Sequence, residues 1–150
     1  MTDDKNMNIR QADVENLAFV RTLLADNTLP NSDVDGSSRI RFLVADDADG
    51  LPVACIGVET YGSDALLRSL AVRPSMRERG VGRTLVVAAE DTARAMRVSR
   101  LFLLTTTASD FFLHVGYDVI NRVDAPDSLQ RSSQFAELCP ASAVCMSKKL

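Results

Sequence analysis

The residues Leu66–Thr84 read LLRSLAVRPSMRERGVGRT, and the two halves of this stretch predict different structures. The first half is an apolar run that Pro74 ends, which is typical of a buried strand. The second half places Gly80 and Gly82 directly before apolar residues that recur at helical spacing as far as Met96. The sequence therefore predicts a strand, a turn that contains glycines, and a helix.

This turn has the properties of an anion-binding site. Glycine lets the backbone approach a ligand closely, and the first turn of a helix carries free N–H groups and a partial positive charge, so the arrangement suits a diphosphate. A Walker loop would need a Lys-Ser/Thr pair after its second glycine, and a dinucleotide fingerprint would need three glycines and a later acidic residue; neither pattern is present. The alternative is a surface turn whose glycines only interrupt the helix.

The spacing Arg77-x-x-Gly80-x-Gly82, preceded by Leu70-Ala71-Val72-x-Pro74, resembles motif A of the GCN5-related N-acetyltransferase (GNAT) superfamily. The resemblance implies an α/β fold with a mixed, twisted sheet of six to seven strands and helices on both faces. It also implies that this sheet is split between its fourth and fifth strands, at 65–72 and 100–105, where the pantetheine arm of acetyl-CoA enters.

The resemblance also implies a set of cofactor-binding residues. In this family the loop amides hold the diphosphate of coenzyme A, and an amide of the fourth strand, here that of Leu70 or Val72, polarises the thioester carbonyl. Acetyl-CoA is thus the expected cosubstrate, and no metal is expected. The residues assigned to it are Leu70, Ala71, Val72, Arg77, Arg79, Gly80, Val81, Gly82, Arg83, Thr84 and Phe112.

Composition favours one domain over 1–150, because a chain of 150 residues with 46% hydrophobic residues can build one sizeable core but not two. A net charge of −3 gives no electrostatic reason to expect nucleic acid or a membrane surface as a partner. Three cysteines, no charged-then-apolar leader and no long apolar run indicate a soluble cytoplasmic protein with free thiols. We expect a monomer or a homodimer.

Apolar periodicity and turn residues predict the other elements. Strands are expected at 7–12, 41–45, 51–59, 65–72, 100–105 and 143–148, and helices at 14–26, 106–114 and 127–138, besides the helix after Gly80. Asp13 is a plausible cap for the first helix. The turns at 46–50 and 61–64 should make the strands around them antiparallel, whereas a helix crossover should make 65–72 and 100–105 parallel. In the family, the loop after the first helix, here 27–38, lies over the acceptor site.

Acetyl transfer to an amine needs a group that takes the amine proton and a way to discharge the thiolate. Many GNAT relatives use a glutamate on the fourth strand as the base, but Leu67 occupies the matching position here. Glu59 on the neighbouring strand end is the best substitute, and its alternative is a solvent-facing carboxylate.

The thiolate has no obvious proton donor either. Phe112 stands where many members have tyrosine, and a phenyl ring cannot protonate a thiolate. His114, the one histidine, could donate this proton, or it is an ordinary residue at a helix end.

Arg68 is expected to alternate with Leu66, Leu70 and Val72 on one face of its strand. A buried charge needs a partner, so Arg68 either pairs with a carboxylate such as Glu59 or binds an acidic substrate. Its planar guanidinium suits a carboxylate or another oxyanion.

Two further segments, 103–107 and 139–146, together with 65–72, resemble the small acetyltransferases of arsenic-resistance gene clusters. Cys139 and Cys145, with Cys55, could bind a soft metalloid as thiolates, although their separation is not zinc-ligand spacing. The alternative is that these thiols are small buried hydrophobic groups.

The resemblance predicts an acetyl-CoA-dependent N-acetyltransferase. Its acceptor would be the amine of a small molecule, acidic or amino-acid-like, in arsenic or toxin resistance. Two alternatives remain open: a non-enzymatic acyl-CoA sensor, favoured by Leu67 and Phe112, and an acetyltransferase of protein N-termini or lysines, which would need an open groove.

Overall fold

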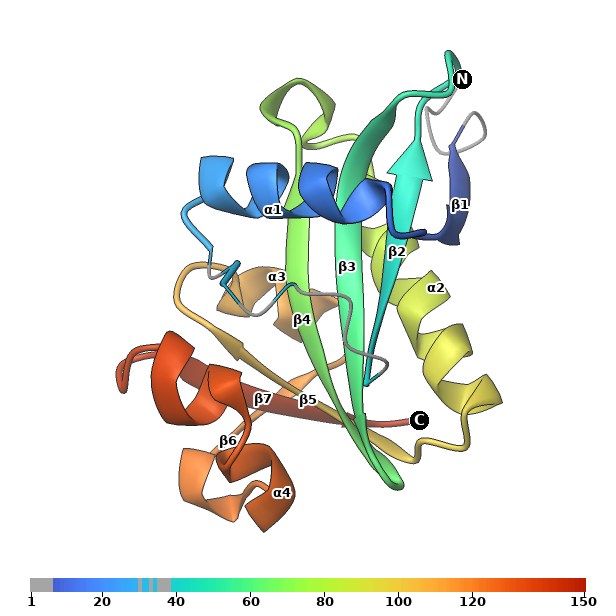
Figure 1. Cartoon of the computed structure of the whole chain (residues 1–150). Helices are drawn as coiled ribbons and strands as arrows, with labels where there is room; N and C mark the ends of the chain where they lie inside the picture. The colour runs from blue at the N-terminus through green and yellow to red at the C-terminus, as the bar shows by residue number, and fades with distance from the viewer. Residues whose placement is uncertain (1–6, 30, 33, 35–38) are drawn as a thin grey trace.

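The structure is a computed structural model that describes residues 7–29, 31, 32, 34 and 39–150 (Figure 1). The described residues build a seven-stranded sheet in the order β1-β2-β3-β4-β5-β7-β6. The strands are β1 Asn8–Gln11, β2 Ile40–Asp46, β3 Pro52–Tyr61, β4 Asp64–Val72, β5 Arg100–Thr105, β6 Asp118–Ile120 and β7 Val144–Lys149. The β4–β5 pair is parallel, and the other described pairs are antiparallel. The expected mixed sheet is thereby confirmed.

Helices cover both faces of this sheet, as expected (Figure 1). The α-helices are α1 Asn16–Asp26, α2 Val81–Ala95, α3 Ser109–His114 and α4 Asp127–Gln130, and the short non-α turns are η2 Pro74–Met76, η3 Arg122–Asp124 and η4 Gln134–Leu138. One core lies between the sheet and α2 and α3. On the other face, α1 covers one cluster of apolar residues, and α4 covers a second one.

Local sequence signals explain where α1 and α2 begin. α1 begins at Asn16 with Glu15 at the N-cap position and without a side-chain cap, so Asp13 is not the cap that the sequence suggested. The Asp13 side chain instead accepts a hydrogen bond from the Asn16 amide, and the Asn16 side chain accepts one from the Asp13 amide, both at 3.1 Å, which closes the turn before α1. Gly80 precedes α2 in the left-handed conformation, with φ of 79°, which glycine adopts with less strain than residues that carry a Cβ. Apolar residues at helical spacing then turn one side of α2 into the core.

A β-bulge in β4 changes which residues share a face. Cys55 pairs with Ala71 and Gly57 with Arg68, so one residue of β3 is opposed by two residues of β4, and Ser69 has a positive φ of 61°. Our expectation that Arg68 shares a face with Leu70 and Val72 is therefore wrong. Beyond the bulge, Leu70 and Val72 pack on the side of α2, whereas the Arg68 stem lies beside Phe42, on the side of α1.

The sheet is split where the family resemblance implied. The β4–β5 pairs are Asp64 with Arg100, Ala65 with Leu101 and Leu66 with Phe102, and the described residues make no pair beyond them. β5 nevertheless continues to pair with β7 as far as Thr105. The second halves of β4 and β5 therefore separate and leave a slot between them.

The tail differs from the single helix expected at 127–138. α4 ends at Gln130. The Ser132 hydroxyl donates a hydrogen bond to the Leu129 carbonyl at 2.5 Å and accepts one from the Phe135 amide at 3.3 Å. These bonds compete with the backbone hydrogen bonds that would continue the helix. The short strand β6 was not expected either. Among the described residues, no helix is both long enough and apolar enough to cross a membrane.

Candidate functional site

A cavity of about 680 Å³ lies in the slot between β4 and β5. Its walls come from the end of α1, from both separated strand halves, from α3 and from the tail, which are far apart in the sequence. The lining residues are 27–29, 67–70, 77, 103–108, 112, 134, 139, 140 and 143. Leu70, Arg77 and Phe112, assigned from the sequence, are therefore in the lining. Sequence reasoning gave no individual role to residues 27–29 or Gln134.

The loop before α2 can bind an anion through backbone groups. Thr84 donates the first intrahelical hydrogen bond, to the Gly80 carbonyl at 3.0 Å, so the amides of the residues from Val81 to Arg83 have no partner within the helix. No side chain of the described residues caps them. The partial positive charge of the helix start adds to their affinity for a diphosphate.

Gly82 supports the same interpretation. A Cβ built at this position would contact only the Phe111 ring, at an ordinary 3.6 Å, so the fold itself does not exclude alanine. Glycine within a helix costs about 1 kcal/mol relative to alanine. Close approach of a ligand to the backbone would explain its presence. The loop thus fits the diphosphate of coenzyme A, and the separated strand edges can accommodate the pantetheine arm.

Arg68 lines the cavity, but its charge is already paired with a carboxylate of the protein. Its Nη1 lies 3.0 Å from Oε1 of Glu59, and its Nε donates to Ser69 Oγ at 3.0 Å. Both charged residues are buried. Gly57 makes room for this arrangement, since a Cβ there would lie 2.9 Å from Phe42 and 3.3 Å from the Arg68 stem. The ion pair that the sequence left open is therefore present.

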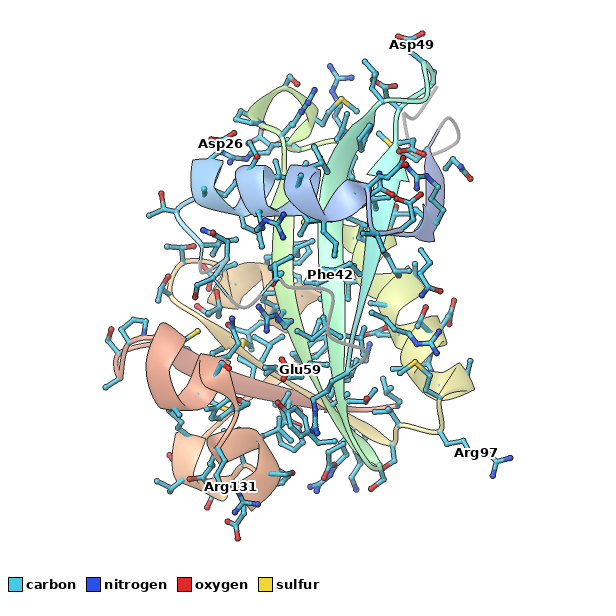
Figure 2. All side chains as sticks on the ribbon, in the orientation of Figure 1. Asp26, Phe42, Asp49, Glu59, Arg97 and Arg131 are labelled. Atoms are coloured by element: carbon cyan, nitrogen blue, oxygen red, sulfur yellow. The ribbon has the colours of Figure 1, made fainter. Side chains whose placement is uncertain are left out.

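The carboxylate of Glu59 is also held from its other side. The Tyr61 hydroxyl donates to Oε2 of Glu59, and the Arg39 guanidinium lies 4.8 Å from the centre of the Tyr61 ring. Burial and the neighbouring Glu59 carboxylate raise the pKa of Tyr61 to about 12. Figure 2 shows Glu59 well inside the outline of the molecule, whereas Arg97 and Asp49 project from it.

The other two catalytic candidates occupy different environments. Phe112 is buried, lines the cavity and packs edge-on against the Tyr117 ring at 5.6 Å between centroids. His114 is exposed at the end of α3, with Nδ1 2.7 Å from the Asp110 carbonyl oxygen, and is not in the lining. Glu59 is not in the lining either. Neither Glu59 nor His114 therefore borders the cavity, and their catalytic roles stay predictions.

The cysteines do not form a cluster. Burial raises the pKa of Cys55 to about 12 and that of Cys145 to about 11, which keeps both thiols protonated near neutral pH. Cys139 lines the cavity and donates to the Gln134 side chain at 3.1 Å. Within the described part of the chain, no group of three cysteine, histidine or acidic residues is arranged to hold a metal ion.

Comparison with known proteins identifies sequence relatives of this chain. A family model described as an acetyltransferase (GNAT) domain matches residues 38–119. An uncharacterised N-acetyltransferase of Chlorobaculum tepidum is 34% identical over 105 residues, which are 69% of this chain and 64% of that protein. An amino-acid acetyltransferase of Pasteurella multocida is 29% identical over 91 residues, 59% of this chain and 21% of that protein. The chain thus spans about a fifth of the length of that enzyme.

Solved structures show the same fold. N-acetylglutamate synthase from Neisseria gonorrhoeae, in complex with coenzyme A and N-acetyl-glutamate, matches with a TM-score of 0.79 and 22% identity, over 96% of this chain and 35% of that one. The family match covers more than half of the sequence and includes β4, the glycine loop and α2. The protein therefore belongs to the GNAT acetyltransferase family.

Proposed function

We propose that the protein is an acetyl-CoA-dependent N-acetyltransferase whose acceptor is the amine of a small acidic or amino-acid-like molecule. The observation that carries the proposal is the cavity in the β4–β5 slot, whose lining contains the guanidinium of Arg77 besides that of Arg68, which is paired with Glu59. Membership of the GNAT family supplies the reaction class.

The roles of the residues follow from this arrangement. Acetyl-CoA supplies an already activated acetyl group. The amides of Val81–Arg83 would hold its diphosphate, and the amide of Leu70 or Val72 would polarise the acetyl carbonyl. Leu67, Leu103 and Phe112 give the slot an apolar wall. Proximity in such a slot can supply much of the rate enhancement, and solvent can protonate the departing thiolate.

The charge of the lining supports an acidic acceptor. It includes two arginines, of which Arg68 is neutralised by Glu59, and, among the described residues, no carboxylate, so its net charge comes from Arg77. Amino-acid acetyltransferases are among the proteins similar to this chain, and one structural neighbour holds N-acetyl-glutamate. Both observations favour an amine that also carries a carboxylate, such as an amino acid.

A role in arsenic or toxin resistance remains part of the proposal. It rests on the sequence of 65–72, 103–107 and 139–146, and each of these segments contributes residues to the cavity lining. An amino-acid-like toxin would fit the same lining as an amino acid. The acceptor panel below therefore includes phosphono and arsono analogues.

A second function, acyl-CoA sensing without turnover, is favoured by one specific observation. Neither a carboxylate nor a histidine belongs to the described part of the cavity lining. Both functions require coenzyme binding, so binding alone does not separate them. Release of the coenzyme A thiol in the presence of an amine does.

The coenzyme site is tested by titration calorimetry with acetyl-CoA on Gly80→Asp. We expect affinity to fall roughly ten-fold or more, because a carboxylate beside the α2 amides would repel the diphosphate and compete for the same donors. Gly50→Asp is the matched control, since Gly50 has φ of 80°, almost the same as that of Gly80, and lies in the β2–β3 turn, outside the cavity lining. Equal affinity in wild type and Gly80→Asp would show that the site is elsewhere.

The reaction is tested by thiol release from acetyl-CoA with a panel of amines. The panel contains amino acids, their phosphono and arsono analogues, polyamines, aminoglycosides and a lysine-containing peptide. We expect turnover with acidic or amino-acid-like members. Turnover confined to polyamines or aminoglycosides would rule out the acidic acceptor, and acetyl-CoA binding without any turnover would support the sensor.

A further inference from the structure

Arg77 is directed differently from what its place in the glycine motif suggests. Its Nε donates to the Val72 carbonyl at 3.3 Å, and its Nη2 donates to the side chain of Asn27, which caps the end of α1. α1 and α2 pack on opposite faces of the sheet. The guanidinium therefore extends from the loop toward α1 rather than toward the amides that begin α2.

In this position Arg77 belongs to the wall of the cavity. It lines the cavity together with residues 27–29 at the end of α1, where the chain enters the loop expected to lie over the acceptor. Residues 67–70 of β4 line the cavity as well. The expected position of that loop over the acceptor would put Arg77 on the acceptor side of the cavity.

The charge of Arg77 is not balanced by the described residues. Both of its hydrogen-bond partners are neutral oxygens, and no described carboxylate forms an ion pair with it. A guanidinium has five N–H donors, so these two bonds leave donors available. Arg68, the other arginine in the lining, is paired with Glu59. Among the described lining residues, Arg77 can therefore form an ion pair with an anionic ligand without breaking an existing ion pair, whereas Arg68 cannot.

We propose that Arg77 binds a carboxylate of the acceptor and so selects acidic amines, an assignment that rests on the proposed function and refines it. The planar guanidinium matches a carboxylate through two parallel hydrogen bonds. Because Arg77 is exposed at the rim, its charge stays solvated until the acceptor arrives, and no buried unpaired charge has to be maintained. Arg68 then serves as a fixed, neutralised part of the wall.

The test compares Arg77→Met with wild type on pairs of acceptors that differ in one charge. The probes are L-glutamate and L-aspartate, the side-chain amides L-glutamine and L-asparagine, and the corresponding α-amides. Wild type should prefer the acid to at least one of its amides. Arg77→Met should lose that preference through a fall of roughly ten-fold or more in kcat/KM for the acid, with little change for that amide.

Controls separate this role from coenzyme binding and from folding. Calorimetry on Arg77→Met separates this role from the acetyl-CoA role that the sequence assigned to Arg77: the acceptor role leaves acetyl-CoA affinity within about two-fold of wild type, whereas a diphosphate role lowers it further. Arg73→Met removes a nearby exposed charge outside the lining and should keep the preference for acids. Arg77→Lys should recover part of that preference, since it restores the charge without the fork.

Three results would overturn the inference, and they are distinguishable. If wild type turns over no acidic amine, the proposed acceptor class fails, and the inference fails with it. If wild type prefers acids and Arg77→Met keeps that preference, the inference alone fails. If Arg77→Met loses acetyl-CoA affinity while its relative preference for acids is unchanged, Arg77 belongs to the diphosphate site.

Discussion

Glu59 illustrates how the role of a residue depends on its partners. Its predicted role as a base would require access to the amine proton, and Glu59 does not line the cavity. Instead, Oε1 faces Arg68 Nη1 at 3.0 Å and Oε2 accepts the Tyr61 hydroxyl. Both interactions give the buried carboxylate a partner, and a buried charge without one would be costly. The resulting Tyr61–Glu59–Arg68 chain fixes one wall of the cavity.

The first residue-scale prediction concerns the tyrosines, which give a clean optical signal because the chain has two of them and no tryptophan. Burial and then Glu59 raise the pKa of Tyr61 to about 12, and burial together with Glu90 raises the pKa of Tyr117 as well. A spectrophotometric titration of the folded protein should therefore show little ionisation near the ordinary tyrosine pKa of about 10.

The raised pKa values of the tyrosines also predict how the stability of the protein changes with pH. Folded pKa values above the unfolded value of about 10 mean that the stabilisation is complete below that pH and is lost as the pH rises through about 12. Glu59→Gln should lower the pKa of Tyr61, because it removes a negative charge next to the hydroxyl. A folded wild-type protein whose tyrosines both titrate near 10 would contradict the buried arrangement.

At the scale of elements, the bulge in β4 decides which side chains enter the cavity. It adds one residue opposite Ile56 and turns Leu70 toward α2 while Arg68 faces α1. The Ser69 carbonyl also accepts the Cys55 thiol at 3.3 Å, and its hydroxyl accepts Arg68 Nε. One irregular residue therefore connects the strand, the buried arginine and the slot.

The prediction at this scale tests the positive φ of 61° at Ser69. Ser69→Val should be less stable than Ser69→Gly by about 1–2 kcal/mol, because a β-branched residue is strained in the left-handed region and glycine is not. Both variants lose the hydroxyl, so the difference isolates the backbone contribution. Urea denaturation measures it, and equal stability of the two variants would mean that the bulge is absent.

At the scale of the whole molecule, a buried charged cluster joins three distant parts of the chain. Oε2 of Glu90 on α2 accepts bonds from the Tyr117 hydroxyl and from Lys148 Nζ on β7, each at 2.9 Å. Lys148 Nζ also donates to the carbonyl of Val115 at 3.1 Å. Tyr117 in turn packs against Phe112, so the cluster supports one wall of the slot from behind.

Glu90→Ala should therefore lower the free energy of unfolding by about 3 kcal/mol, because it leaves Lys148 and Tyr117 without their buried partner. Asp91→Ala is the matched control on the next residue. Its pair with Arg94 is exposed, at 70% and 49% of the two side chains, so its removal should change stability by less than about 1 kcal/mol. Similar losses in the two variants would show that the cluster does not join the elements.

The sequence by itself determined the elements whose signals are local. The apolar run at 100–105 became β5 with those bounds, the glycine of the motif precedes α2 as expected, and Asp13 closes the turn before α1. The spacing of Arg77, Gly80 and Gly82 also identified the family correctly. Periodicity, caps and turns act between residues close in the chain, so a pattern in the sequence is enough to reveal them.

Only the tertiary structure decided which residues contact one another across the chain and which of them line the cavity. The Ser69 bulge depends on pairing with β3, the three-residue strand β6 depends on pairing with β7, and Arg77 contacts a residue at the end of α1. The interactions that define the site join residues far apart in sequence, such as Glu90 and Lys148. Such contacts form only when the whole chain packs. A charge without a partner is costly only where it is buried, and these residues are buried only in the folded state.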